Sequence, residues 1–229
     1  MSDKKQEHEA GSADVALAKV QDFWTRNAKV ISGVLVGVIL LIGGYFGYKN
    51  FIQQPKEEKA VNDMFKAESY YRMDSARLAL NGDGQSYGFL KIIDKYSGTD
   101  AANLASYYAG ICYLKLDDNQ NAVKYLNKFS TDSKQVQARA YKLLGDANAD
   151  LGKSADALNF YKKAAHHFEE DANASGEALF LAASLAQGVI KNQKEAIELF
   201  KELKQKFPST QWAYQADTYL AQLGVYNVN

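Results

Sequence analysis

The residues best suited to chemistry in this chain are few and scattered. His166 and His167 precede Glu169, Glu170 and Asp171, and these side-chain types bind metals or transfer protons. Adjacent residues on a helix point about 100° apart, so the two histidines cannot ligate one metal ion together. We therefore interpret this run as an acidic surface loop and expect no metal site there.

Two further motifs are equally incomplete. Cys112 lies among Ala109, Ile111 and Leu114, which indicates a buried thiol that packs in the core. The run 117–119 (Asp-Asp-Asn) lacks the remaining ligands of a calcium loop. No glycine-rich phosphate loop follows a strand, because no strand-like segment is present. The sequence thus predicts a protein that is not an enzyme, with no catalytic residue, metal, cofactor or small-molecule substrate.

Charge and composition exclude other classes of protein. Lys and Arg number 27, and Asp and Glu also number 27, so the basic excess typical of a nucleic-acid-binding protein is missing. One cysteine cannot form an internal disulfide. Only two prolines occur in 229 residues rich in Ala, Leu, Lys and Gln. This composition favours an all-α protein.

The segment from Val30 to Tyr48 is an unbroken uncharged run, VISGVLVGVILLIGGYFGY. As a helix it would be about 28 Å long, close to the ~30 Å hydrocarbon thickness of a bilayer. The region before it is too long, and the residues after it too bulky, for a cleaved signal peptide. We predict a tail over 1–29, a transmembrane signal-anchor helix over 30–49 and a soluble domain over 50–229.

The charges beside this span do not determine its orientation. The basic residues near it are Lys19, Arg26 and Lys29 before, and Lys49, Lys56, Lys59 and Lys66 after. The positive-inside rule therefore gives no decision.

The regions that flank the span have their own patterns. Residues 1–12 are charged and lack large apolar side chains beyond the first methionine, so we expect them to be disordered. Leu17, Val20 and Trp24 recur at helical spacing, and this stretch either lies on the membrane surface or extends the anchor helix. Residues 53–56 (QQPK) are interpreted as a hinge before the soluble domain.

Glycines give the span two small-residue faces. Gly33 and Gly37 form one, and Gly43 and Gly47 form the other. Such spacing lets transmembrane helices approach closely, so these four glycines are predicted to contact another helix.

From Glu57 onward the apolar residues follow a helical period, and glycine, proline and asparagine separate the segments. The expected helices cover 57–80, 85–96, 100–115, 118–130, 134–150, 154–168, 174–188, 193–206 and 210–223.

These helices form repeating pairs. Three segments place a small residue in a first helix and an alanine in a second: Gly110 with Ala122, Gly145 with Ala157, and Ala183 with Ala196. The three alanines are separated by 35 and 39 residues. This pattern resembles the tetratricopeptide repeat, whose period is 34. We expect Gly110 and Ala122 to let paired helices approach, and Tyr161 or Phe200 to fill the gap to the next pair.

An earlier, degenerate repeat is also predicted. Phe89, Ile92, Tyr96 and Thr99 have the same spacing as Phe200, Leu203, Phe207 and Thr210. Helix 57–80 would form the first half of this repeat, and the last helix would cap the stack. The expected fold is therefore all-α, with one N-terminal transmembrane helix followed by a tetratricopeptide-like solenoid.

The resemblance implies a partner-binding groove, because four positions of each first helix line the concave face of such solenoids. These positions correspond to Leu104, Tyr107, Ile111 and Leu114; to Arg139, Lys142, Asp146 and Ala149; and to Ala178, Leu181, Leu185 and Gly188. The Lys/Asn clamp for a peptide carboxylate is missing. Two interpretations stay open: the groove binds an extended or helical apolar segment of a partner, or these residues are buried against neighbouring helices.

The overall layout resembles a family of membrane proteins, the YfgM-type ancillary subunits of the SecYEG translocon. The likeness is sharpest at the anchor with the following QQPKEEKA and at KYSGTDAANLASYYAG over 95–110. It implies a cytosolic tail, an inner-membrane anchor and a periplasmic domain. It also implies two protein partners, the translocon channel subunits and a membrane-anchored periplasmic foldase or chaperone, and no catalytic residue.

The sequence therefore predicts a non-enzymatic, membrane-anchored scaffold of the Sec export machinery in the bacterial inner membrane. Two alternatives are a general tetratricopeptide adaptor in envelope assembly or cell division, and a membrane tether that regulates a cytosolic partner.

Overall fold

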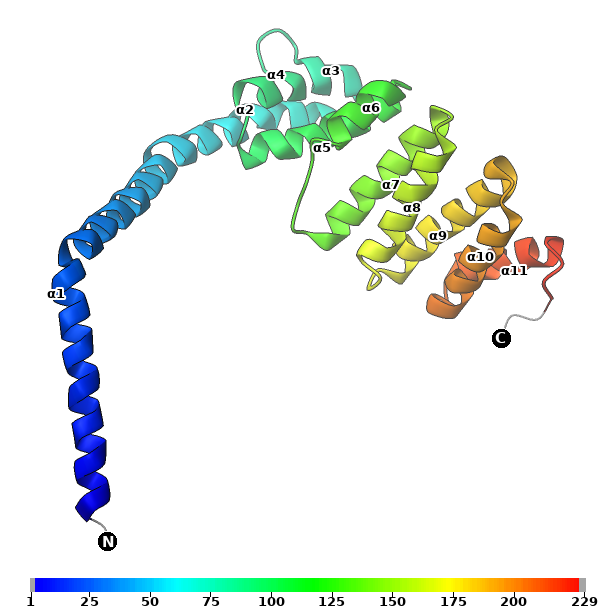
Figure 1. Ribbon diagram of the computed structural model, residues 1–229. Coiled ribbons are helices and arrows are strands. Elements are labelled where there is room, and N and C mark those ends of the chain that lie inside the picture. Colours follow the sequence, from blue (N-terminus) through cyan, green and yellow to red (C-terminus); the bar gives the residue numbers. More distant parts are fainter. Residues whose placement is uncertain (1–2, 227–229) are drawn as a thin grey trace. The chain divides into compact units, whose positions relative to one another are not determined.

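The computed structural model describes residues 3–226, with side chains from Leu17 onward, and divides the chain into two units between Pro55 and Lys56. Helices account for the regular structure of the described residues, apart from one isolated bridge between Gly82 and Tyr87 (Figure 1). The all-α prediction is confirmed. The helices are α1 (Asp3–Tyr48), η1 (Lys49–Gln53), α2 (Gln54–Arg72), α3 (Ala76–Asn81), α4 (Phe89–Lys95), α5 (Asp100–Lys115), α6 (Asn119–Leu126), α7 (Lys134–Asp150), α8 (Ser154–His167), α9 (Ala172–Leu185), η2 (Ala186–Ile190), α10 (Gln193–Lys206) and α11 (Gln211–Gln222).

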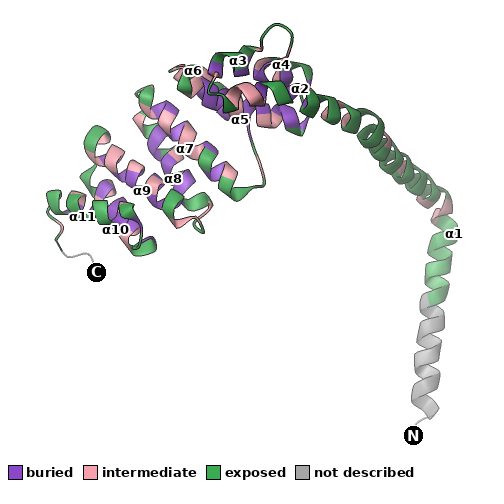
Figure 2. Ribbon diagram, turned by 180° about the vertical axis from the view of Figure 1, so that it is seen from behind, coloured by how far each residue is buried: buried purple, intermediate pink, exposed green. Residues whose placement is uncertain are grey.

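The first unit is essentially the single helix α1. From Leu17 onward, the helix contains a segment that is long and apolar enough to cross a membrane, and none of that segment is buried (Figure 2). The expected disorder over 1–12 is wrong from Asp3 onward, since α1 already begins there. Lys, Gln, Glu and Ala in this stretch are good helix formers, which explains the extension. Met1 and Ser2 lie outside the described residues.

The junction after the predicted span is helical. The π-helical turn Lys49–Gln53 leads directly into α2, and the boundary between the two units falls within residues 53–56, the predicted hinge. Pro55 has no N–H to donate and its ring crowds the preceding turn. A wider π turn just before the proline is the kind of local adjustment that this lost hydrogen bond favours.

The second unit is a stack of helix pairs. The pairs α5–α6, α7–α8 and α9–α10 follow one another, and α11 covers the last pair (Figure 1). The buried residues lie on the helix surfaces that face neighbouring helices (Figure 2). The core forms three clusters, one around α2 to α5, one around α5 to α7 and one around α8 to α11. Each helix thus buries its apolar side against its neighbours in the chain.

Four turns in left-handed conformation mark the repeats. Within each pair the connection contains one residue with φ between 58° and 72°, and an alanine with no exposed surface follows five residues later. The turn residues are Asp74, Asp117, Gly152 and Lys191, and the alanines are Ala79, Ala122, Ala157 and Ala196. The region before α5 is therefore also a repeat in the same register, and it is the first of four along the chain.

The first repeat carries an insertion in its second helix. A large buried residue lies nine positions after the turn residue in the other repeats, as Leu126 does after Asp117. In the first repeat Phe89 lies fifteen positions after Asp74, so six extra residues interrupt the helix and divide it into α3 and α4. A Cβ on Gly88 would lie 2.3 Å from the Leu80 carbonyl oxygen, so only glycine closes this loop.

This insertion corrects two predicted helices. The single helix over 57–80 is wrong, because α2 ends at Arg72 and the turn at Asp74 separates it from α3. The helix expected from residue 85 begins at Phe89 instead. The first half of the repeat is thus α2 alone.

Glu57 of α2 also contacts the next repeat. Its carboxylate accepts hydrogen bonds from the Asp100 and Ala101 N–H groups, at 2.7 and 2.8 Å, and so caps α5.

Close approach at the glycines is confirmed within the pairs. A Cβ added to Gly110 would lie 2.5 Å from Leu126, and one added to Gly145 would lie 2.5 Å from the Tyr161 ring. Tyr161 therefore fills the space over the helix it is paired with, and it also belongs to the core cluster that contains the next pair, α9–α10. Phe200 also reaches onward, because its ring stacks on Tyr219 of α11 at 5.3 Å.

The predicted likeness between the first and last repeats is confirmed by two equivalent helix caps. Thr99 Oγ1 donates to the Tyr96 carbonyl at 2.7 Å and accepts from Ala102 N–H. Thr210 does the same with Phe207 and Ala213. A buried threonine thus begins both α5 and α11.

Candidate partner-binding groove

A cavity of about 880 Å³ opens in the second unit, between α5, α7 and the beginning of α9. It is lined by five of the predicted groove residues: Leu104, Tyr107 and Ile111 on α5, and Arg139 and Lys142 on α7. Stacked repeats of this kind rotate slightly from one to the next, and this rotation creates concave surfaces between their first helices.

The α5 wall is aromatic. The Tyr107 ring lies 4.8 Å from Phe129 and 5.8 Å from Tyr108, and Tyr71 of α2 lies 4.9 Å from Tyr108. Burial raises the pKa of the Tyr107 hydroxyl, and nearby Arg139 only partly opposes this. The Tyr107 hydroxyl therefore stays neutral near pH 7, and an uncharged aromatic wall suits an apolar or aromatic ligand side chain.

The α7 wall is charged. Lys142 Nζ lies 3.2 Å from Asp146 Oδ2 and 3.2 Å from Glu177 Oε1, so this lysine links α7 to α9. Tyr161 donates its hydroxyl hydrogen to Asp146 at 3.0 Å. Partial burial lowers the pKa of Lys142, but the two carboxylates outweigh it and the pKa lies above its usual range. Because Lys142 is already compensated by two anions, exposed Arg139 is the cation that the wall offers to a ligand.

The remaining predicted groove residues do not line this cavity. Leu181 and Leu185 are half-buried and pack against the core cluster around α8 to α11, and Leu114 packs against the middle cluster. Asp146 is held by its lysine and tyrosine. Ala178 is buried, Ala149 is half-buried and Gly188 is exposed. Burial against neighbouring helices thus describes the far end of the expected groove, and it also describes Tyr107 and Ile111, which are buried in the middle core cluster.

Several cavity residues fall outside the predicted positions. Tyr71 comes from α2, and Tyr108, Phe168 and Glu177 also line the cavity. Tyr108 and Glu177 each lie next to a predicted position in the sequence. Tyr71 carried no such signal, because its contribution depends on where α2 ends.

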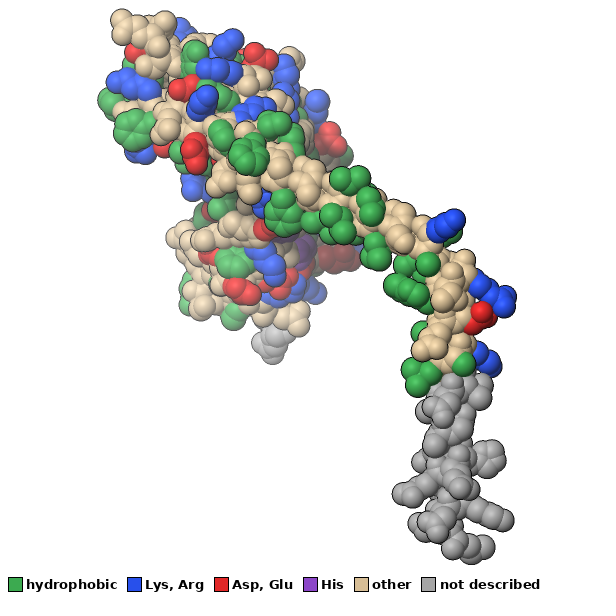
Figure 3. All heavy atoms as spheres, turned by 90° about the vertical axis from the view of Figure 1, so that its left-hand side faces the viewer, with side chains coloured by type: hydrophobic (Ala, Val, Ile, Leu, Met, Phe, Trp, Pro, Cys, Tyr) green, Lys and Arg blue, Asp and Glu red, His purple; other side chains and the backbone are tan. Residues whose placement is uncertain are grey.

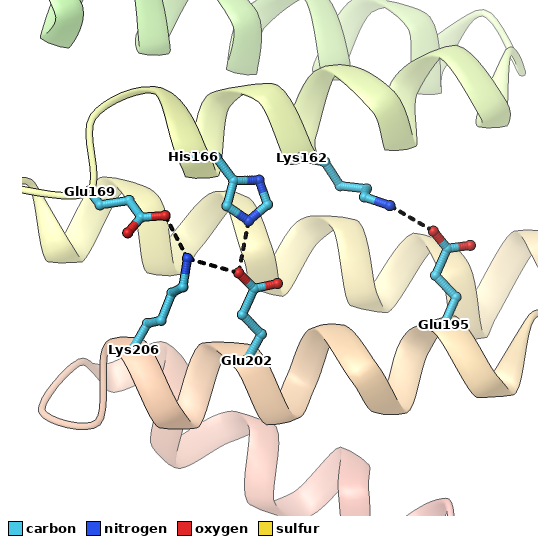
Figure 4. Close-up of polar contacts among 6 residues, drawn as sticks. All are labelled: Lys162, His166, Glu169, Glu195, Glu202 and Lys206. Carbon is cyan, nitrogen blue, oxygen red and sulfur yellow. Dashed lines mark hydrogen bonds and ion pairs between the residues drawn. The ribbon is translucent and has the colours of Figure 1, made fainter.

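The chemically suited residues are engaged in separate structural contacts (Figure 4). His166 Nε2 lies 2.8 Å from Glu202, which is also 3.1 Å from Lys206, and Lys206 reaches Glu169 at 2.6 Å. His167 instead packs edge-on against the ring of Tyr141 on α7. The two histidines point toward different helices, as their spacing predicted. Among the side chains that the structure describes, no group of three or more His, Cys, Asp or Glu could hold a metal ion.

Two other predictions can be placed. Cys112 is fully buried, and burial raises the pKa of its thiol to about 11, so it is a poor nucleophile near neutral pH. In the predicted span, a Cβ added to Gly33, Gly37, Gly43 or Gly47 would meet no atom within 4 Å. These glycines leave room for a close neighbour, and their contact with another helix stays a prediction.

Comparison with known proteins identifies the class of repeat. The tetratricopeptide repeat family model matches residues 104–132 and 177–210. These segments cover most of α5–α6 and of α9–α10, the second and fourth repeats. No curated protein matches the chain.

The second unit is accordingly a tetratricopeptide-like solenoid, a class of module that binds other proteins on its concave face. The α7–α8 pair and the first repeat lie outside the matched segments, yet they share the left-handed turn and the buried alanine.

Proposed function

We propose that this protein is a membrane-anchored, non-enzymatic scaffold of the Sec export machinery, and that its repeat domain binds the translocon and a periplasmic chaperone or foldase. The observation that carries the adaptor function is the cavity between α5, α7 and α9, in a repeat fold that binds proteins. The Sec assignment is supported by the layout, in which a long apolar helix precedes the repeats.

The groove favours an amphipathic segment of a partner. Leu104 and Tyr108, which are half-buried, offer apolar surface for a large side chain, and exposed Arg139 offers a cation to a carboxylate. Tyr107 and Ile111 also line the cavity but are themselves buried. Helices or extended segments that carry apolar anchors beside an acidic residue meet both requirements. Affinity would come mainly from the aromatic wall, because an exposed ion pair adds little.

We place the N-terminus in the cytoplasm and the repeat domain in the periplasm, with α1 in the bacterial inner membrane. The test is a reporter fused after Asn229. A periplasm-dependent reporter is expected to be active there, and a cytoplasm-dependent one inactive. Activity of the cytoplasmic reporter would overturn this orientation.

Site-specific crosslinking tests the partners. A photo-crosslinking residue at Leu104 or Arg139 in the full chain should yield adducts with a translocon channel subunit or a membrane-anchored foldase. The same residue at Lys201, which is exposed on α10, is the matched control and should not. Equal adducts from both faces would refute groove binding. An exclusive cytosolic adduct from the N-terminal tail would instead favour the regulatory tether.

A further inference from the structure

The N-terminal part of α1 has two distinct faces just before the apolar span. Leu17, Val20, Phe23 and Trp24 are each more than half exposed. The charged residues of the same stretch, Lys19, Asp22, Arg26 and Lys29, recur at intervals of three and four residues. In Figure 3 the part of α1 next to the grey atoms shows hydrophobic side chains on one side and charged ones on the other. Large apolar residues opposite basic ones are typical of helices that lie in a membrane interface.

A change of direction separates this stretch from the span. Thr25 Oγ1 donates to the carbonyls of Gln21 and Asp22 at 3.0 and 3.1 Å, and Asn27 Nδ2 donates to that of Phe23 at 2.9 Å. Ser32 Oγ donates to the Ala28 carbonyl in the same way. Side chains that return to carbonyls in the preceding turn often bend helices. Figure 1 shows that α1 does bend in its N-terminal part.

We infer that residues Leu17–Lys29, here called the interfacial segment, lie along the membrane surface with the apolar face among the lipid headgroups and upper acyl chains. This inference rests on the proposed anchor in α1. It decides between the two arrangements that the sequence left open, an interfacial helix and a straight extension of the span.

Geometry favours the lipid surface as the occupant of this face. Leu17 precedes Val30 by 13 residues, so a straight helix would hold it about 20 Å from the start of the hydrocarbon region. The headgroup layer is only about 5–7 Å thick on each side, so the backbone of this whole apolar face would lie beyond it, from Trp24 at about 9 Å to Leu17 at about 20 Å. A bend near Thr25 to Ser32 brings the whole face back to the bilayer without any other partner.

Charge is consistent with this occupant. The interfacial segment holds three basic residues and one acidic residue, and Asp22 is paired with Arg26 at 3.0 Å. Lys19 and Lys29 then lie on the polar side, where anionic headgroups would attract them. Their long side chains can extend along the apolar surface toward the phosphates.

Fluorescence quenching in vesicles tests the inference on the full chain. Trp24 and Trp212 are the two tryptophans of the sequence, so Trp24→Phe with Trp212→Phe leaves a dark background. Leu17→Trp then reports on the interfacial segment, and Leu40→Trp, in a separate variant, reports on the span. The vesicles contain zwitterionic and anionic phospholipids that carry brominated acyl chains at a shallow or a deep position.

We expect the tryptophan at 17 to be quenched by the shallow label and protected from aqueous iodide, and the tryptophan at 40 to be quenched by the deep label. Val20→Asp places a charge on the apolar face and should abolish lipid quenching at 17 while leaving position 40 unchanged. Ala18→Asp adds the same charge on the polar side of the helix and should leave both signals intact.

The negative outcomes of this quenching experiment can be told apart. Iodide access at 17 with deep quenching at 40 would overturn the inference while the anchor stands. Protection from iodide at 17 without lipid quenching would show that a second copy of the chain covers the face, and would also overturn it. Loss of lipid quenching at both positions would refute the anchor and the inference together.

Discussion

Gly145 shows how one residue sets the distance between two helices. A methyl group there would lie 2.5 Å from the Tyr161 ring, a separation that atoms do not tolerate. We predict that Gly145→Ala lowers the free energy of unfolding by about 1–3 kcal/mol, because overpacking outweighs the better helix propensity of alanine. Urea denaturation of the full chain in detergent measures the change.

The matched control is Gly188→Ala, where a Cβ meets no atom within 4 Å. This substitution should leave the urea midpoint unchanged or raise it slightly. An equal loss at both positions would show that general helix effects, rather than contact with Tyr161, govern the site.

Glu202 makes the stability of the fold depend on pH in the acidic range. Partial burial alone would raise the pKa of its carboxyl, but hydrogen bonds from His166 and Lys206 outweigh burial and the pKa lies below its usual range. A carboxyl whose pKa is depressed by folding stabilises the protein above its unfolded pKa of about 4.3, and this contribution disappears as pH falls through the folded pKa.

We therefore predict that Glu202→Gln lowers the free energy of unfolding at pH 7 by up to about 1 kcal/mol, a modest amount because the pairs are partly solvated. The difference from the unsubstituted chain should shrink below pH 4. Glu198→Gln, at an exposed position on the same helix, is the control and should leave the pH profile unchanged. Urea midpoints between pH 3 and pH 7 measure both, and a constant difference across that range would contradict the assignment.

At the scale of the element, the six-residue insertion between α3 and α4 is predicted to be dispensable. Deletion of residues 82–87 would place Phe89 nine positions after Asp74, the spacing that Leu126 has after Asp117. With Gly88→Ala, the second helix of the first repeat should become continuous, and circular dichroism should show retained cooperative unfolding.

Deletion of residues 82–86 is the control for register. It would place Phe89 ten positions after the turn and rotate its buried side chain by about 100°. We expect this variant to lose the cooperative transition of the first repeat. If both deletions behaved alike, the loop rather than the register would hold α4 in place.

The same region shows what the sequence could and could not predict. Helices 100–115, 134–150 and 193–206 have the predicted bounds, because glycine, threonine or asparagine signals and a strong apolar period define them. The break after Arg72 was missed because the left-handed residue there is Asp74, with no glycine or proline to mark it. The groove was predicted in part for the same reason: Leu104, Tyr107 and Ile111 follow from helical spacing, but Tyr71 depends on where α2 ends.

At the scale of the whole molecule, stability in a solenoid passes between neighbouring repeats, and the terminal one needs a cap. Here α11 is that cap: Phe180 lies 5.4 Å from Trp212 and 5.3 Å from Tyr219, and Phe200 stacks on Tyr219. We predict that a chain ending after Ser209 exposes these rings and loses order first in α9 and α10. Hydrogen exchange should show protection falling there while α2 to α5 stay protected.

A chain that ends after Gly224 keeps all of α11 and should exchange like the full protein. This comparison separates a local role of the cap from a global one. If removal of α11 unfolded the first repeat as readily as the last, the four repeats would form one cooperative unit. The separate core clusters around α2 to α5 and α8 to α11 argue for the local result, because few buried side chains are shared between the two ends of the stack.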